Sequence, residues 1–280
     1  MLKQIIKFYK RKNKPVYDLT GKQLFKKLRI EINADCTRKC KFCPRTFDKK
    51  RQNNHQRMPQ KKVLSIIDQS IEMGFTGEVG FDFYNEPTLD DRLLFFINYA
   101  KEKDLSVALV TNGDLLKANK EYARELFNAS SNVYLSLYDY DDKKGRDLLI
   151  DQWTNFINEI NIPQKKVKFK GNYFEFGNRA GSIERNDIYN HNKELDDKTP
   201  IKAACKKFIS KLNIRYDGEV AICCEDAFVQ CSLGNVNDLS ISEIWMGDKR
   251  MRIARELAEG NRKNIIPCNK CVQSMIRINF

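Results

Sequence analysis

The sequence predicts an α/β protein built on a parallel β-sheet, and two observations support that prediction. From about residue 28 to residue 176, short apolar runs alternate with longer amphipathic runs. Strands that alternate with crossover helices form parallel sheets. After residue 200 the pattern changes to a shorter unit that holds six of the nine cysteines. We therefore expect an open, partial (β/α)6 barrel, TIM-like in layout, followed by a small α+β domain.

The first half of the alternating region contains three expected strands and two expected helices. The strands cover residues 28–33, 78–84 and 106–110. Between the first two, apolar residues recur at helical spacing over residues 60–73, and Gly74 supplies a C-cap. A second helix is expected over residues 91–103, with Asp90 as its N-cap. Each strand is thus followed by a segment that returns the chain to the start of the next strand.

The second half of the region continues the alternation and then breaks it. We expect helices over residues 120–127 and 147–160, strands over 133–137 and 165–169, and a further apolar run at 173–176. The polar stretch from residue 178 to residue 200 ends the pattern. The expected organisation is therefore a basic extension (1–24), a core domain (25–185), a linker (186–200) and a second domain (201–280). In the second domain, Asp217-Gly218 suits a hairpin turn between strands at 214–216 and 219–223.

Composition restricts where the protein acts. No apolar run approaches the roughly 20 residues that a membrane-spanning helix needs, and the basic extension has no signal-peptide core. We expect a cytoplasmic protein, in which cysteines serve as metal ligands or reactive thiols rather than disulfides. The net charge of +13 is compatible with an anionic partner, but the basic residues are scattered and lack an interleaved aromatic motif. Lysine as an ordinary surface residue explains the charge better, so no nucleic-acid partner is expected.

Three cysteines directly follow the first expected strand, at a C-x3-C-x2-C spacing. Thiolates are the ligands of iron–sulfur clusters, and Cys36, Cys40 and Cys43 can bind three irons of a cubane 4Fe–4S cluster. The fourth iron would stay open for a small molecule. Structural zinc, the alternative, takes four ligands, and neither His55 nor His191 lies at a zinc-finger spacing from this loop.

The loop from Cys36 to Cys43 also resembles the signature of the radical S-adenosylmethionine (radical SAM) enzymes. That resemblance implies a 4Fe–4S cluster that binds SAM at its open iron. It further implies reductive cleavage of SAM to methionine and a 5′-deoxyadenosyl radical, which abstracts a hydrogen atom from the substrate. A carrier such as flavodoxin or ferredoxin would supply the electron. Phe42, just before the last cysteine, would pack near the adenine or shield the cluster from solvent.

The resemblance extends to two segments at the ends of later strands. Tyr84-Asn85-Glu86-Pro87 resembles the Gly-Gly-Glu-Pro segment of the family, in which backbone groups and the glutamate bind the amino group of SAM. Here Asn85 replaces one of the glycines, while Glu86 keeps the carboxylate that can pair with an ammonium. Thr111 and Asn112 belong to a Thr-Asn-Gly segment that lines the SAM pocket in the family. Either segment on its own would also suit an ordinary turn.

Two further residues are implied more weakly. Ser136, on the fourth expected strand, resembles the serine that contacts the SAM ribose, although strand alternation also allows a small core residue there. Arg179, in Asn178-Arg179-Ala180-Gly181, would contact a carboxylate or the substrate, or would lie in solvent.

The second domain resembles the twitch module, a shortened form of the SPASM domain found behind many radical SAM cores. The resemblance lies in Cys205, Gly218, Cys223 and the C-x2-C pair Cys268 and Cys271. It implies a second, auxiliary 4Fe–4S cluster with four thiolate ligands and no open iron. Spacing alone would favour a zinc ribbon; the preceding radical SAM core favours the cluster. A full SPASM domain would have further cysteines after this pair, so one auxiliary cluster is expected.

Cys224 and Cys231 have no role in either set. Each is a small buried side chain, a reactive thiol or a substitute ligand. Next to the auxiliary ligand Cys223, Glu225 and Asp226 are candidate bases by position.

The resemblance implies two activities, and two alternatives to them remain. The twitch-bearing aminocyclitol dehydrogenases oxidise a secondary alcohol by two electrons, which predicts a sugar or cyclitol substrate. Modification of a ribosomally made peptide is the second activity, and RNA modification, suggested by the charge, is more distant. A protein that binds a cluster or zinc without catalysis is the remaining alternative.

Overall fold

The computed structural model describes residues 24–40, 43–51, 54–138, 143–171, 179–182, 205 and 208–271. Its centre is an eight-stranded sheet with the order β5-β4-β3-β2-β1-β6-β7-β8. The first six strands in this order are parallel, whereas β6–β7 and β7–β8 pair antiparallel. The strands are β1 (Lys27–Ile30), β2 (Glu78–Gly80), β3 (Ser106–Thr111), β4 (Asn132–Ser136), β5 (Val167–Lys170), β6 (Lys211–Ile214), β7 (Glu219–Ala221) and β8 (Ser232–Asn235).

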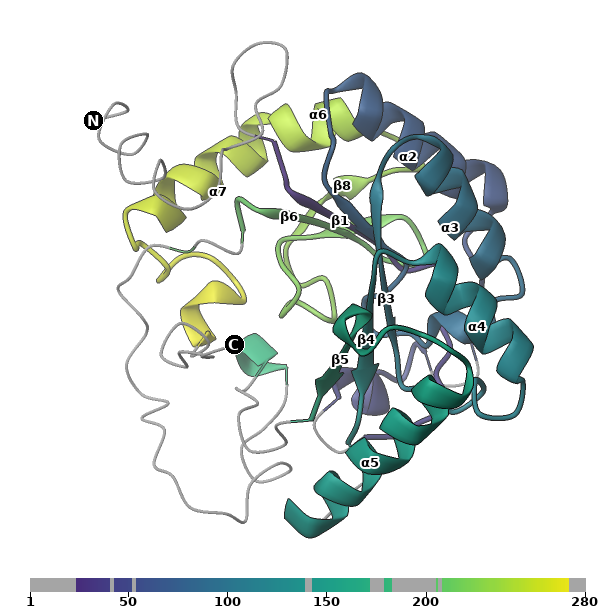
Figure 1. The fold of residues 1–280 in the computed structure, drawn as a ribbon. Helices are drawn as coiled ribbons and strands as arrows, with labels where there is room; N and C mark the ends of the chain where they lie inside the picture. The colour runs from purple at the N-terminus through teal and green to yellow at the C-terminus, as the bar shows by residue number, and fades with distance from the viewer. Residues whose placement is uncertain are drawn as a thin grey trace.

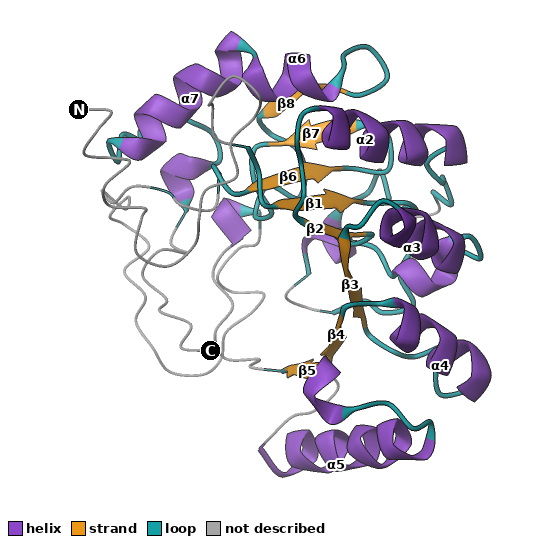
Figure 2. Ribbon diagram, turned by 45° about the horizontal axis from the view of Figure 1, so that its top comes forward, coloured by secondary structure: helices purple, strands orange, loops and turns teal. Residues whose placement is uncertain are grey.

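Six α-helices of the described chain cover one side of this sheet (Figures 1 and 2). They are α2 (Gln60–Glu72), α3 (Leu93–Glu102), α4 (Lys120–Ala129), α5 (Lys143–Glu159), α6 (Ile241–Met246) and α7 (Asp248–Ala258). The apolar residues of the strands and helices form one buried core between the two layers. This arrangement confirms the predicted α/β fold with a mostly parallel, open sheet. None of the described helices has the length and apolar character that crossing a membrane requires.

Local sequence signals explain most helix boundaries. α2 ends where Gly74 adopts a φ of 89°, a left-handed conformation that glycine takes without strain. The side chain of Asn119 caps α4 by accepting the backbone N–H of Tyr122. α3 begins later than predicted, at Leu93, because the Asp90 carboxylate accepts the backbone N–H of Arg92 and closes a turn before the helix.

The sixth parallel strand has a different origin from the one expected. The apolar run at 173–176 lies outside the described residues. β6, from the C-terminal part of the chain, pairs in parallel with β1, so that Leu28 is opposite Leu212 and Ile30 is opposite Ile214. The sheet therefore continues across the domain boundary that the sequence suggests. The β6–β7 hairpin forms as expected around Asp217-Gly218.

Candidate active site at the carboxyl ends of the strands

A cavity of about 300 Å³ gathers residues from the carboxyl ends of the parallel strands. Parallel α/β sheets place their reactive groups at this edge. The cavity brings together all three cysteines of the first loop and every described residue that the resemblance implied for SAM. The lining includes Cys36, Cys40, Cys43, Asn85, Glu86, Thr111, Asn112, Ser136 and Arg179. Phe42 lies outside the described residues.

The cysteine loop folds tightly around this cavity. The backbone N–H of Cys43 donates to the carbonyl of Cys40 at 3.0 Å. The sulfur of Cys36 accepts the backbone N–H of Arg38 at 3.5 Å and the side-chain amide of Asn112 at 3.8 Å. Burial raises the pKa of Cys36 to about 11 and also raises the pKa of Cys43. A bound cation would offset that burial, since a thiol that coordinates a metal is deprotonated and its proton is released to solvent.

Arg38 fastens the cysteine loop to two neighbouring strands. Its guanidinium donates to the carbonyl of Asn112 at 3.1 Å and to the carbonyl of Ser136 at 3.2 Å. It also forms an ion pair with Asp114, whose carboxylate accepts the hydroxyl of Thr37 at 2.7 Å. Arg38 and Asp114 are not among the residues predicted for the site. The only available signal was their position within or directly beside the two motifs.

Glu86 is buried at the centre of the site, and its two carboxylate oxygens differ. Oε1 accepts three hydrogen bonds, from the backbone N–H and hydroxyl of Thr88 and from the hydroxyl of Thr111. Oε2 accepts the backbone N–H of Asn112 at 2.8 Å. Burial raises the pKa of Glu86, although these donors oppose the shift. Among the hydrogen bonds of the described residues, Oε2 has one donor and therefore retains a lone pair for an ammonium group.

A buried ion pair anchors the segment that follows the cysteine loop. Arg51 donates to both oxygens of Glu31, at 2.6 and 3.0 Å, and both side chains are almost completely buried. Asp48 accepts the Nε–H of Arg51 at 3.1 Å. The Glu31 carboxylate also accepts the backbone N–H groups of Tyr84 and Tyr216. One carboxylate at the end of β1 thus joins the cysteine segment, the end of β2 and the end of β6.

Replacing Arg51 by methionine is expected to lower the free energy of unfolding by about 3–5 kcal/mol, because Glu31 would remain buried without its partner. The measurement is urea unfolding of iron-free protein. Lys120→Met is the matched control, since Lys120 and Glu159 form an ion pair in which both side chains are more than half exposed. That variant should cost no more than about 1 kcal/mol. Equal losses for the two variants would contradict the anchoring role of Arg51.

The cavity extends to the C-terminal part of the chain through Tyr84 and Arg179. The hydroxyl of Tyr84 donates to the carbonyl of Cys224 at 2.7 Å, and burial raises the pKa of this phenol well above its usual value. Arg179 forms an ion pair with Glu225 at 3.1 Å. Arg179 has a φ of 48°, which non-glycine residues rarely adopt, and such backbone strain is concentrated at functional sites. Cys224, left without a role by the sequence, lines this cavity.

The two candidate bases occupy different environments. Glu225 is 3% exposed and contacts Arg179 and the thiol of Cys224. Asp226 is fully buried, and its carboxylate accepts the backbone N–H groups of Gln230 and Cys231. Asp226 therefore stabilises the turn that leads to β8, whereas Glu225 lies behind an arginine of the cavity wall.

The four cysteines predicted as auxiliary ligands come from separate elements. Cys205 donates its backbone N–H to Leu257 in α7, Cys223 follows β7, and Cys268 begins the 3₁₀ turn η7 (Cys268–Lys270) that precedes Cys271. Burial raises the pKa of Cys268 to about 12, and the neighbouring thiols of Cys205 and Cys271 add to this shift. Burial also raises the pKa of Cys223, and Cys268 contributes to that shift.

The donor set fits the predicted clusters. All nine cysteines are free thiols. Within the described residues, no three His, Cys, Asp or Glu side chains lie close enough together to hold a single metal ion. In a cubane each thiolate binds its own iron, so the three cysteines of the first loop and the four of the second set match the ligand numbers of the two predicted clusters.

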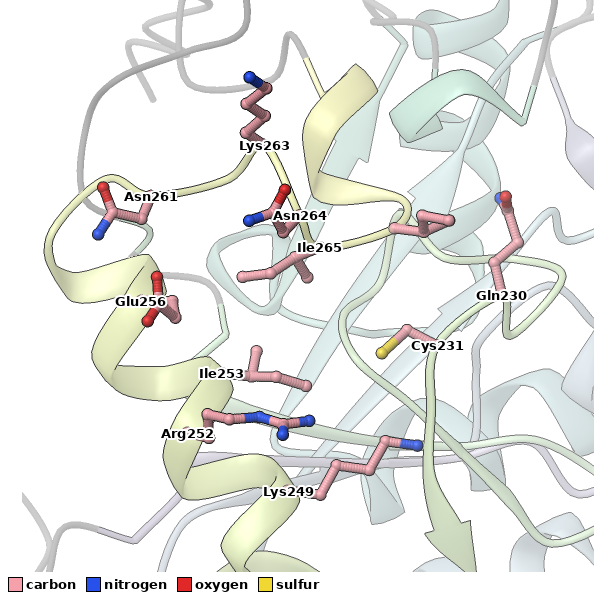
Figure 3. A pocket seen from close by; sticks show the side chains of 11 residues that line it. Gln230, Cys231, Lys249, Arg252, Ile253, Glu256, Asn261, Lys263, Asn264 and Ile265 are labelled. Carbon is pink, nitrogen blue, oxygen red and sulfur yellow. The ribbon is translucent and has the colours of Figure 1, made fainter.

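A second cavity, of about 690 Å³, lies between α7 and the segment that precedes the last cysteine pair. Figure 3 shows Lys249, Arg252 and Ile253 of α7 on one side and the sulfur of Cys231 directed into the space on the other. Burial raises the pKa of Cys231. None of the seven predicted cluster ligands lines this cavity, so Cys231 faces a different space from Cys224.

Comparisons with protein families match the two halves of the chain separately. Residues 30–162 match the model of the radical SAM superfamily, and residues 205–272 match SPASM, an iron–sulfur cluster-binding domain. The chain is similar to the S-adenosyl-L-methionine-dependent 2-deoxy-scyllo-inosamine dehydrogenase of Niallia circulans. The two sequences are 24% identical over 251 residues, which cover 89% of this chain and 93% of the relative.

Solved structures share the fold over most of the chain. BtrN in complex with AdoMet and 2-DOIA has a TM-score of 0.70 at 23% identity, covering 89% of this chain and 94% of BtrN. Streptococcus suis SuiB bound to its precursor peptide SuiA has a TM-score of 0.55 at 13% identity, covering 89% of this chain and 71% of SuiB. At these identities the likeness shows a common fold.

Proposed function

Since the chain belongs to the radical SAM superfamily and carries a SPASM-type cluster-binding domain, we propose that it oxidises a secondary alcohol of a sugar or cyclitol by two electrons. The observation that carries this proposal is the single cavity that contains the three-cysteine loop and also reaches Cys224, the neighbour of the predicted auxiliary ligand Cys223. A substrate held there would lie between the two cysteine sets. The dehydrogenase activity named for the Niallia circulans relative supports the same reaction.

Two sets of residues would hold the clusters. Cys36, Cys40 and Cys43 would bind the first 4Fe–4S cluster, and Cys205, Cys223, Cys268 and Cys271 the second. When bound, the first cluster supplies the electron that cleaves SAM into methionine and a 5′-deoxyadenosyl radical, and the second accepts an electron from the substrate.

The cavity residues bind and orient SAM and the substrate. Oε2 of Glu86 would accept the SAM ammonium, and Asn85, Thr111, Asn112 and Ser136 would line the rest of the SAM pocket. Arg38 holds the cysteine loop against this pocket. Positioning the reacting C–H bond next to the SAM 5′ carbon is the protein's main contribution to the rate.

The oxidation releases two hydrogens from the substrate in different forms. The C–H hydrogen leaves as an atom to the 5′ carbon, the O–H hydrogen leaves as a proton, and one electron remains to be accepted, so that a C=O bond replaces the alcohol. Of the two candidate bases we assign the proton to Glu225, because its carboxylate contacts two residues that line the cavity, Arg179 and Cys224. Asp226 is engaged by two backbone N–H groups and is not assigned this role.

The cysteine ligands indicate the compartment and the electron donor. Seven thiolates that would bind iron must stay reduced, which favours a reducing compartment such as the cytoplasm. There, flavodoxin or ferredoxin would deliver the electron that starts each turnover.

The test is anaerobic reconstitution with iron and sulfide, followed by incubation with SAM and either dithionite or reduced flavodoxin. About eight irons per chain are expected for two cubanes, and SAM should yield 5′-deoxyadenosine and methionine. With the correct alcohol, one ketone should form for each 5′-deoxyadenosine. A reduced protein that binds the iron but never cleaves SAM would rule out the enzyme; cleavage coupled to a modified peptide would replace the proposed substrate class.

Glu225→Gln is expected to lower the rate of alcohol oxidation by about 10²–10⁴-fold, the usual contribution of a general base, while cleavage of SAM continues. Asp226→Asn is the matched control and should leave the oxidation rate nearly unchanged, although the protein should be less stable. A loss of oxidation in Asp226→Asn alone would reverse the assignment.

A further inference from the structure

The face of the sheet that points away from the helices, here called the inner face, is polar. Residues that pair across parallel strands share a face. Lys211, Lys27 and Glu78 form one row across β6, β1 and β2, and Asn213, Arg29 and Gly80 form the next. The same face continues at the far end of the sheet, where Tyr134 and Ser136 of β4 pair with Lys168 and Lys170 of β5.

This composition differs from that of a packed barrel interior, which branched apolar side chains normally fill. The apolar residues of these strands point instead toward the helices. The inner face of the described sheet has more cations than carboxylates. The cations are Lys27, Arg29, Lys168, Lys170 and Lys211, and the carboxylates are Glu78 and, just after β2, Asp82.

Both carboxylates already have cationic partners. Glu78 pairs with Lys27 at 3.0 Å and with Arg29, and Asp82 lies 3.6 Å from Nε of Arg29. Gly80 permits this arrangement, because a Cβ at that position would lie 2.2 Å from Nη1 of Arg29 and 2.5 Å from Oδ1 of Asp82. The protein's own acidic groups on this face are therefore engaged with Lys27 and Arg29.

Several buried polar atoms on the same face have no hydrogen-bond partner in the described structure. They are Nη1 of Arg29, Oδ1 of Asp82 and both side-chain polar atoms of Asn213. Arg29 is 9% exposed and Asn213 is fully buried. Buried polar groups are nearly always paired, and an unpaired group indicates a missing ligand or water. Nη1 of Arg29 and the amide of Asn213 are therefore left to water or to a polar ligand, whereas Oδ1 of Asp82 already lies in an ion pair with Arg29.

Lys170 connects this face to the active site. It lines the same cavity as Cys36, Cys40 and Cys43. Its ammonium lies 4.4 Å from the ring centre of Tyr134, and no carboxylate of the described residues forms an ion pair with it. Burial lowers the pKa of Lys170; Asp82 opposes this shift, and Arg29, Lys211 and Lys27 add to it. Asp82 is already paired with Arg29, so an ammonium without an ion pair of its own in the described structure is complementary to an anionic ligand.

We propose that the substrate carries an anionic group, a phosphate or a carboxylate, which binds Lys170 at the inner face while the reacting carbon faces the cysteine loop. This inference rests on the proposed function and narrows its substrate class to sugar or cyclitol phosphates or acids. Such a substrate would differ from the inosamine in the name of the Niallia circulans relative. The anion would receive charge-assisted hydrogen bonds from Lys170.

The test measures binding of inorganic phosphate and of acetate by calorimetry, using protein with both clusters oxidised and SAM saturating. SAM then occupies its own site and is not cleaved. In Lys170→Ala, binding should weaken at least about tenfold, the loss expected for a hydrogen bond to a charged group. Lys168→Ala removes the same charge from an exposed position on the same strand and should weaken binding less than about threefold. Lys170→Arg should restore most of the affinity.

Stronger binding of phosphate would identify a phosphorylated substrate, and stronger binding of acetate an acid. Equal affinity of the wild type and Lys170→Ala for both anions would overturn the proposal. So would binding of propylammonium in place of either anion, with loss of that binding in Asp82→Asn. Because no outcome depends on SAM cleavage, failure of this inference is distinguishable from failure of the proposed function.

Discussion

Replacing Cys40 by alanine is expected to abolish cleavage of SAM. The variant retains two of the three thiols around the cavity, Cys36 and Cys43, which cannot hold a cubane whose remaining iron binds SAM. Iron content should fall by about half, since only the second set of four cysteines stays complete. The measurement is the yield of 5′-deoxyadenosine from anaerobic, dithionite-reduced protein, which should fall to that of a protein-free sample.

Cys231→Ala is the matched control for this experiment. Cys231 is also a free, partly buried thiol, but it lines the second cavity. That variant should retain its iron and the cleavage of SAM. Full cleavage in Cys40→Ala, or its loss in Cys231→Ala, would contradict the assignment of the three-cysteine loop.

Replacing Cys268 by alanine should separate the two halves of the reaction. Cys268 is the most buried of the four predicted auxiliary ligands, and the thiols of Cys205 and Cys271 lie close enough to raise its pKa. Without it the second cluster is lost or incomplete, while the cavity at the first loop keeps all its residues. SAM should still be cleaved, but no ketone should form, because the substrate radical has no electron acceptor within the protein.

Continued cleavage of SAM also shows that Cys268→Ala is folded, so loss of the ketone cannot be attributed to misfolding. Electron paramagnetic resonance of the reduced variant should show the signal of one cluster in place of two. Ketone formation at the wild-type rate would remove the auxiliary cysteines from the oxidation. Loss of both reactions would indicate that the second cysteine set is needed for the first site to form.

The elements that could be predicted from the sequence are those whose signals are local. The cysteine loop, the turn at Asp217-Gly218 and the Gly74 end of α2 are each specified within a few residues. The positions of Glu86, Thr111 and Asn112 at one edge followed from parallel strands, because such strands end together. Their side chains do line one cavity with the cysteines.

The features that could not be predicted depend on residues far apart in the chain. The pairing of β6 with β1 joins segments on opposite sides of the expected linker (residues 186–200), and no local pattern indicates it. Glu31 gave no signal either, because its role arises only when Arg51, Tyr84 and Tyr216 converge on it. Glu225 and Asp226 are adjacent in sequence and chemically alike. Only the fold distinguishes them, because it pairs Glu225 with Arg179 and directs the Asp226 carboxylate to the backbone of a turn.

The position of β6 also determines which parts of this enzyme can exist alone. β1 lies between β2 and β6. A fragment that ended before residue 205 would therefore leave β1 at the edge of the sheet, with a row of unpaired backbone groups available to another molecule. Such a fragment would be prone to aggregate even with its cysteine loop intact. The two cluster-binding halves are consequently inseparable as folding units, and engineered chimeras must exchange β6 together with the strand beside it.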